Sequence, residues 1–137
     1  IREIRKGNMP KFSKKSLEKL EQCDVRLQGI FKEVIKYFDC SILEGSRDLE
    51  EQYRLWEQGK TKVQYPNSKH NKVPSLAVDV VPYPVDWQDR ERMTYFAGFV
   101  MGIAVSMGIS LRWGGDWDSD TDLSDNKFDD LVHFELK

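Results

Sequence analysis

A carboxylate stands in the middle of the most strand-like segment of the chain, residues 76–81. The segment is rich in β-branched residues and ends at Pro82, a combination that predicts a buried β-strand. Asp79 interrupts its apolar run, and a carboxylate placed there costs free energy unless it is paired or binds a metal ion. A lone buried aspartate is more often satisfied by hydrogen bonds than by a metal ion. Hydrogen bonding and metal binding therefore both stay open as interpretations of Asp79 at this point.

The rest of the apolar pattern predicts helices and strands in alternation. Ser13 can cap a helix whose apolar residues recur three, four or seven positions apart, and this helix is expected to continue to about Tyr37. Gly59 can close a second helix, and a third begins near Asp89. The expected helices are 13–37, 49–58 and 89–108, and the expected strands are 41–46, 76–81, 109–113 and 131–136. The sequence therefore predicts a single α+β domain in which about three helices pack against a small antiparallel sheet.

Length, charge and hydropathy exclude several classes of protein. The 137 residues suit one domain, because chains usually divide only above roughly 250 residues. The formal charge of −2 offers no basic surface for nucleic-acid phosphates. No run approaches the ~18 apolar residues of a membrane-spanning helix, and we expect neither membrane insertion nor a signal peptide. Met9 resembles a natural start, so residues 1–8 are expected to be a vector-derived, upstream or disordered extension, and the functional domain to span 9–137.

The two cysteines, Cys23 and Cys40, are too few for a secreted scaffold held by disulfides. On a mostly helical segment their α-carbons would lie roughly 25 Å apart at ~1.5 Å per residue, whereas a disulfide needs about 7 Å or less. Both are therefore expected to be free thiols in a protein made in a reducing cytoplasm.

The chain contains two histidines, and each lies at the border of a predicted strand. His70 precedes the strand that holds Asp79, and His133 lies in the last strand. Two imidazoles and one carboxylate can supply three ligands to Zn²⁺ and leave the fourth position for water, as in catalytic zinc sites. The same set can hold Fe(II) in an oxygenase, but those enzymes usually need a larger all-β barrel. We interpret His70, Asp79 and His133 as zinc ligands.

A metal-dependent hydrolase also needs a carboxylate that does not bind the metal, to accept a proton from water and deliver it to the leaving amine. Asp130, three residues before His133, is the leading choice, and spacing alone leaves Asp129 open as the alternative. Glu135 shares the strand face of His133 and could orient the site from behind it.

These segments resemble a family of zinc peptidases that includes D-Ala-D-Ala carboxypeptidases and phage L-alanyl-D-glutamate endolysins, related in fold to the hedgehog signalling domain. The family motifs are S-x-H-x-x-G-x-A-x-D and, far downstream, an acid followed by x-x-H-x-E. The matches are Ser68, His70, Ala77 and Asp79 in the first motif and Asp130, His133 and Glu135 in the second. Arg47 matches the arginine of a G-x-R segment that precedes a helix. The interval from His70 to Asp79 is two residues longer than the motif, which we interpret as a longer loop before the strand.

The resemblance implies a zinc peptidase that cuts the L-alanyl-D-glutamate bond in the stem peptide of bacterial peptidoglycan, acting as a monomeric phage endolysin. It implies that Asp130 transfers the proton, that Arg47 stabilises the charged intermediate, and that Ser68 and Glu135 support the site. Without the resemblance, Arg47 is as well explained by a structural ion pair. Such an enzyme is made in the host cytoplasm and reaches the wall after another phage protein opens the inner membrane. The alternatives are a D-Ala-D-Ala carboxypeptidase and a non-catalytic, metal-containing module that binds the cell wall.

Two features downstream of the third expected helix stay open. Trp113 and Trp117 could line a peptide groove, although packing in the core explains Trp113 at least as well. Aspartates alternate along 116–122, but the segment lacks the Gly and Glu that an EF-hand requires at its sixth and twelfth positions. A solvated acidic loop is therefore expected there.

Overall fold

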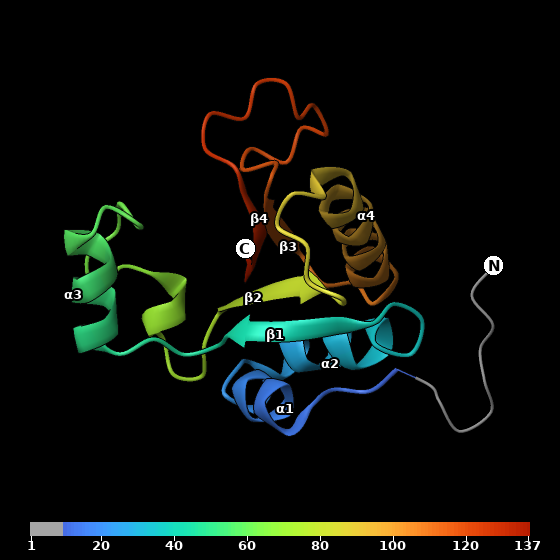
Figure 1. The fold of residues 1–137 in the computed structure, drawn as a ribbon, viewed down its shortest axis with the longest axis horizontal. Coiled ribbons are helices and arrows are strands. Elements are labelled where there is room, and N and C mark those ends of the chain that lie inside the picture. Colours follow the sequence, from blue (N-terminus) through green and yellow to red (C-terminus); the bar gives the residue numbers. More distant parts are fainter. Residues whose placement is uncertain (1–9) are drawn as a thin grey trace.

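Four antiparallel strands form the centre of the computed structural model, which describes residues 10–137 (Figure 1). They lie in the order β1-β2-β4-β3. Their bounds are β1 (Cys40–Glu44), β2 (Ala77–Pro82), β3 (Leu111–Gly114) and β4 (Asp130–Leu136). The sheet and the helices packed on it confirm the predicted α+β class, whereas the expectation for residues 1–8 lies outside the described residues.

The helices in this part of the chain are α1 (Lys14–Glu21), α2 (Val25–Val34), α3 (Leu49–Glu57) and α4 (Arg90–Ser106), with a 3-10 turn, η1 (Lys69–Asn71). Helices α3 and α4 agree with the prediction. Asp48 and Asp89 cap their first turns by accepting backbone N–H groups. Gly59 follows α3 with a φ of +72°, a left-handed conformation that glycine adopts readily. Across residues 10–137, no helix combines the length and apolar character needed to cross a bilayer.

The prediction of one continuous helix over 13–37 is wrong, because the chain breaks between α1 and α2. At the break, the backbone N–H of Asp24 donates to the carbonyl of Ser75 at 2.8 Å, and the N–H of Ser75 donates to the carbonyl of Gln22 at 2.9 Å. The Asp24 side chain then caps α2 by accepting the N–H of Arg26 at 2.9 Å. Both helices bury one apolar face, so the helical spacing of apolar residues continues across the break. The sequence pattern therefore does not reveal the break. The break anchors the segment that leads into β2.

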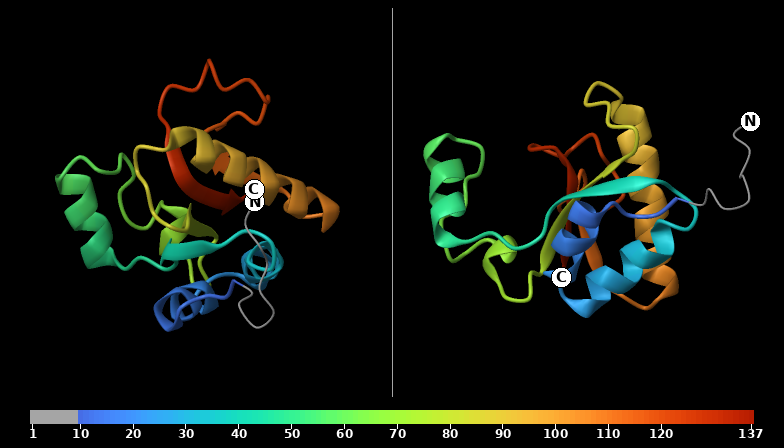
Figure 2. Two further views of the ribbon diagram at one scale, coloured as in Figure 1. Left: turned by 45° about the vertical axis from the view of Figure 1, so that its right-hand side comes forward. Right: turned by 60° about the horizontal axis from the view of Figure 1, so that its bottom comes forward.

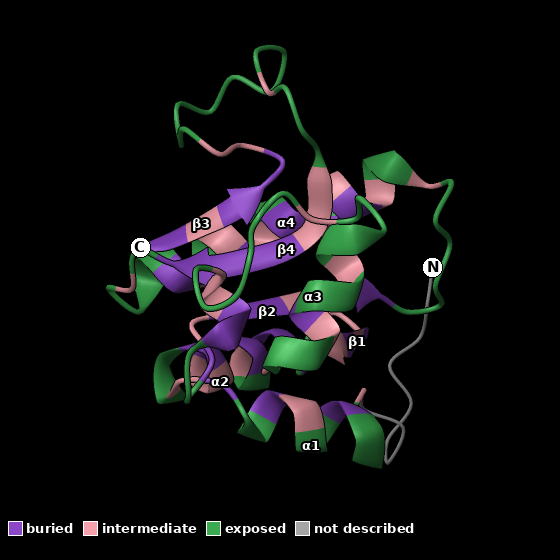
Figure 3. Cartoon of the chain, turned by 90° about the vertical axis from the view of Figure 1, so that its left-hand side faces the viewer, coloured by how far each residue is buried: buried purple, intermediate pink, exposed green. Residues whose placement is uncertain are grey.

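The two faces of the sheet have different roles, because successive side chains of a strand point to opposite sides. Val78, Val80 and Phe134 belong to the hydrophobic core. Helix α4 packs against β2, β3 and β4, helix α2 packs against α4, and α1 packs against β1. Asp79 and His133 occupy alternate positions and line a cleft together with residues of α3 and of the long loops. Helix α3 lies on the side of the sheet away from α4 (Figure 2), and burial follows the strands rather than α3 (Figure 3). The sheet thus presents its polar face away from the core.

Cys23 and Cys40 are buried and free, as predicted. Burial raises the pKa of both thiols to about 12, so neither forms the reactive thiolate near pH 8. We expect the folded protein to react with Ellman's reagent at pH 8 at least ~100-fold more slowly than the protein unfolded in guanidinium chloride. Rapid titration of either thiol without denaturant would contradict this burial.

Candidate functional site

Three polar side chains form a row across the open face of the sheet. In the strand register, Glu44 of β1 lies opposite Asp79 of β2, and Asp79 lies opposite His133 of β4. Strand pairing therefore places Asp79 beside His133, although the two are 54 positions apart in the sequence. The half-buried carboxylate that the sequence left unexplained has a partner, His133, on the neighbouring strand.

His70 reaches this row from the η1 turn. The Ser68 hydroxyl accepts the backbone N–H of His70 at 3.2 Å, and the Asn71 side chain accepts the N–H of Ser68 at 3.1 Å, so the turn is capped on both sides. Nδ1 of His70 donates to the carbonyl oxygen of Gly45 at 2.7 Å. Nε2 of the same ring lies 3.2 Å from Oδ1 of Asp79. The turn thus orients the imidazole toward the sheet.

His133 is held from its outer side. Its Nε2 donates to Glu135 at 2.8 Å, and Glu135 in turn pairs with Lys69 at 3.2 Å and Arg112 at 3.3 Å. Burial opposes the charged form of His133, but the hydrogen bonds with Asp79 and Glu135 outweigh burial and raise the pKa of His133 to about 9. Burial also opposes the ionisation of Glu135, yet its hydrogen bond with His133 lowers the pKa of Glu135 to about 2. The surroundings of His133 therefore favour positive charge.

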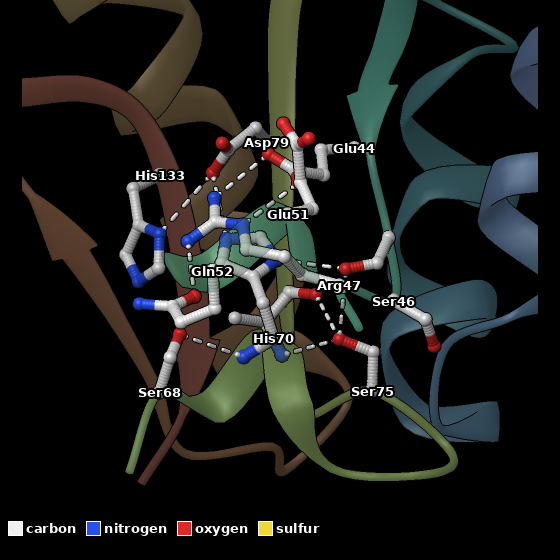
Figure 4. Close-up of polar contacts among 12 residues, drawn as sticks. Glu44, Ser46, Arg47, Glu51, Gln52, Ser68, His70, Ser75, Asp79 and His133 are labelled. Atoms are coloured by element: carbon white, nitrogen blue, oxygen red, sulfur yellow. Dashed lines mark hydrogen bonds and ion pairs between the residues drawn. The ribbon is translucent and has the colours of Figure 1, made fainter. Parts of the chain in front are cut away.

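The spacing of the three side chains suits a metal ion. His70 Nε2, Asp79 Oδ1 and His133 Nδ1 lie within 4.8 Å of one another, and the two nitrogens are 3.2 Å and 3.1 Å from the oxygen (Figure 4). Two ligands that are each about 2.0–2.1 Å from a tetrahedral zinc ion lie about 3.3 Å apart. The observed separations therefore match those of zinc ligands.

The hydrogen bonds around the group also require a cation. Each neutral imidazole has one N–H, and the Gly45 carbonyl and the Glu135 carboxylate accept these protons on the outer sides. A neutral ring therefore turns a lone pair toward Asp79, whereas a protonated ring, the form that the raised pKa of His133 favours, donates an N–H to it. Burial opposes the ionisation of Asp79, but hydrogen bonds with His133 and His70 hold its pKa well below the usual range. Three acceptors that face one another need a proton or a metal ion between them, and the donor set is one that zinc prefers.

Asp130 enters the same cleft at the start of β4, where it pairs with Gly114 of β3. A Cβ on Gly114 would lie 2.2 Å from the carbonyl oxygen of Asp130, so this pairing requires glycine. Burial and the charge of Asp79 raise the pKa of Asp130, which suits a group that takes up a proton. Asp129 instead pairs with Arg90 at the surface and does not line the cleft. The structure thus favours Asp130 over Asp129 as the free acid.

Arg47 lies beside the ligands in a buried network (Figure 4). Its Nε and Nη2 donate to the two carboxylate oxygens of Glu44 at 2.8 Å and 2.7 Å, and Nη1 donates to Gln52 at 2.9 Å. Burial opposes the charge of Arg47, but Glu44 outweighs it and raises the pKa of the guanidinium. The fully buried Gln52 also accepts from Asn71 at 3.3 Å and donates to the carbonyl of Val63. Arg47 is therefore both part of an ion pair and a lining residue of the cleft.

The cleft has a volume of about 580 Å³, within the range typical of ligand sites. One wall is the loop after α3, which contributes Lys60 and Lys62, and the other is the β3–β4 loop, which contributes Trp117 and Phe128. The metal-ligand group, Asp130 and Arg47 line the same space. The cleft therefore brings together the residues that the sequence motifs singled out far apart in the chain.

The two tryptophans of the β3–β4 region have different positions. Trp113 is 6% exposed, its indole N–H donates to the carbonyl of Leu131 at 2.8 Å, and it does not line the cleft. Trp117 does line the cleft, and the centre of its ring lies 5.3 Å from the centre of the His133 ring. The expectation of core packing therefore holds for Trp113, and the tryptophan beside the ligands is Trp117.

The acidic loop after β3 is largely exposed. Side chains of Asp116, Asp118 and Asp120 approach within 4.8 Å of one another, with Asp116 half-buried and the other two exposed. Backbone N–H groups of the loop donate to its carboxylates, for example Asp122 to Asp120 at 2.8 Å. A hydrogen bond shared with Asp120 raises the pKa of Asp125 to about 6. The carboxylates of this loop do not line the cleft.

Sequence reasoning missed Glu44, Gln52 and the lysines of the cleft wall. Gln52 is the one buried residue of α3, and its burial has no counterpart in the sequence pattern. The structure also explains why position 45 is a glycine, because a Cβ there would lie 2.4 Å from the carbonyl oxygen of Lys19. The pairing of Glu44 with Arg47 depends on the end of β1, which the sequence places only approximately.

Known proteins resemble this chain over most of its length. A family model described as phage L-alanyl-D-glutamate peptidase matches residues 9–137. The L-alanyl-D-glutamate peptidase of Escherichia phage T5 is 27% identical over 120 residues, which cover 84% of this chain and 87% of that protein. The crystal structure of the Serratia marcescens L-Ala D-Glu endopeptidase ChiX is similar with a TM-score of 0.74 and 26% identity, covering 95% of this chain and 92% of that one. Sequence and fold thus point to the same relatives.

Proposed function

Because the chain belongs to the phage L-alanyl-D-glutamate peptidase family, we propose that it is a zinc-dependent peptidoglycan hydrolase that cleaves the bond between L-alanine and D-glutamate in the stem peptide. One observation carries the proposal for the site. His70, Asp79 and His133 direct their ligand atoms at one another inside a cleft that Asp130 and Arg47 also line. This arrangement combines a three-ligand metal site with a separate acid and a buried cation.

The ligand atoms in this proposal are Nε2 of His70, Nδ1 of His133 and Oδ1 of Asp79. A zinc ion bound there would supply Lewis acidity toward the scissile carbonyl and toward water. The Gly45 carbonyl and the Glu135 carboxylate fix the two rings by accepting their outer N–H groups. The imidazoles therefore need little reorganisation to serve as ligands.

Asp130 is the proton carrier in this mechanism. Its carboxylate accepts a proton from the attacking water and delivers it to the nitrogen of the leaving D-glutamate. The raised pKa of Asp130 helps it to retain that proton until the amine leaves. The metal ligands hold no proton that could replace it, because their outer N–H groups are bound to Gly45 and Glu135.

Arg47 is placed to stabilise the negative charge that develops on the carbonyl oxygen. A guanidinium has five N–H donors, and Glu44 and Gln52 use three of them. One donor on each of Nη1 and Nη2 stays free for the substrate. Since Glu44 holds the guanidinium bidentately, its position is set before the substrate arrives, which favours stabilisation of the transition state.

We further propose that the enzyme acts as a monomer in phage lysis, is made in the host cytoplasm and reaches the wall once the inner membrane is opened. The relative from phage T5 supports this setting. The stem peptide is then the macromolecular partner that the cleft accommodates.

Digestion of purified peptidoglycan with and without a chelator tests the proposal, with mass spectrometry of the products. We expect new D-glutamate amino termini and L-alanine carboxyl termini, their loss on chelation and their return with Zn²⁺. Release of terminal D-alanine alone would establish the carboxypeptidase instead. No cleavage by folded, zinc-loaded protein would favour a binding module.

A further inference from the structure

Two lysines on one wall of the cleft carry charges that the described residues do not neutralise. The other cations of the cleft are paired, Arg47 with Glu44 at 2.7 Å and Lys69 with Glu135 at 3.2 Å. Lys60 and Lys62 line the same cleft, but within residues 10–137 neither has a carboxylate within 4.0 Å of its ammonium group. Their positive charge is therefore available to a ligand.

The wall that bears these lysines is tied to the catalytic network. Gln52 donates its side-chain N–H to the carbonyl of Val63, next to Lys62, and accepts the guanidinium of Arg47 at 2.9 Å. Across the cleft, the Lys62 ammonium lies 5.7 Å from the centre of the Phe128 ring on the opposite wall. Gln52 and Phe128 thus hold the Lys62 end of this wall relative to the site, and Lys60 lies two residues before it in the same lining.

The chemistry of the substrate supplies a matching anion. A glutamate residue has two carboxyl groups, and only one of them continues the peptide beyond the scissile bond. The other stays a free carboxylate on the residue whose nitrogen leaves. A carboxylate that enters this cleft needs a cation, because Asp79 and Asp130 already place negative charge there.

We infer that Lys60 and Lys62 form a carboxylate-binding subsite that recognises the free carboxylate of the substrate's glutamate. The inference rests on the proposed function. It identifies the free carboxylate as the part of the substrate that this wall binds. The lysines act in binding, and the proton and oxyanion chemistry stays with Asp130 and Arg47. A substrate whose free carboxylate is converted to a carboxamide loses this interaction.

The test compares two synthetic stem peptides that differ only at this group, one with the carboxylate and one with the carboxamide. For the zinc-loaded full chain, we expect kcat/KM to be about tenfold higher for the carboxylate, the size of a charge-assisted hydrogen bond that is partly open to solvent. In the Lys60→Gln/Lys62→Gln variant, the ratio should fall to near one. In Lys60→Glu/Lys62→Glu it should invert in favour of the carboxamide.

The ratio separates recognition from folding, because a general structural defect lowers the activity on both peptides alike. Lys14→Gln/Lys15→Gln is the matched control, since these exposed lysines of α1 lie outside the cleft and the charge change is the same. The control should keep the tenfold ratio. An unchanged ratio in Lys60→Gln/Lys62→Gln, or a wild-type ratio near one, would overturn the subsite but leave the peptidase intact. Failure of the wild type to cleave either peptide would overturn the proposed function and the subsite with it.

Discussion

Replacing Asp130 by asparagine should lower kcat by a factor of about 10² to 10⁴ while zinc content and fold stay as in the wild type. Asparagine has nearly the same size but cannot accept the proton of the attacking water. It also removes one negative charge beside Asp79. In the wild type, repulsion from Asp79 contributes to the raised pKa of Asp130. The measurement is steady-state hydrolysis of a synthetic stem peptide, together with metal analysis and circular dichroism of the same preparation.

The neighbouring aspartate provides the control for this experiment. Asp129 pairs with Arg90 at the surface and lies outside the cleft lining, so Asp129→Asn should keep kcat within about twofold of the wild type. The pH profile gives a second check on Asp130. Because its pKa is raised, the carboxylate protonates as the pH falls at values above the ordinary ~3.9 of aspartate, and wild-type activity should decline there. A fully active Asp130→Asn enzyme, or an equal loss in Asp129→Asn, would remove Asp130 from the mechanism.

The fold could be predicted where a local signal marks each element. The β-branched run before Pro82, Asp89 at the start of α4 and Gly59 after α3 are such signals, and the structure contains the corresponding strand and helices. The break between α1 and α2 depends instead on hydrogen bonds with Ser75, which is distant in sequence. Strand order also depends on long-range contacts, because a period of two identifies a strand but does not identify its neighbours.

The candidate site shows the same limit. Residue type and motif spacing were enough to propose His70, Asp79 and His133, whose ligand atoms the structure brings together. The spacing did not indicate Glu44, because its place beside Asp79 depends on the register of β1 and on a bulge in that strand. Nor did it indicate that Trp117 rather than Trp113 would lie in the cleft, since that depends on the path of the β3–β4 loop.

Converting Asp79 to asparagine should weaken zinc binding by at least ~100-fold and abolish peptide hydrolysis without unfolding the protein. A directly bound ligand contributes more than the 10- to 100-fold that is typical of its supporting groups. The fold should survive, because the asparagine amide can donate its N–H to an imidazole lone pair where the carboxylate could not. The measurement is thermal unfolding after chelation, with and without added Zn²⁺, and competition with a chelating dye for the affinity.

For the wild type, Zn²⁺ at 100 times its dissociation constant should stabilise the fold by about 2.7 kcal/mol, because the ion binds the folded chain. Asp79→Asn should show little of this gain at the same concentration. Glu18→Gln on the exposed side of α1 changes the charge equally and should retain all of it. If Asp79→Asn gained as much stability from Zn²⁺ as the wild type, the ion would bind elsewhere. The row of Glu44, Asp79 and His133 would then be a structural network held together by a proton, which the raised pKa of His133 would by itself explain.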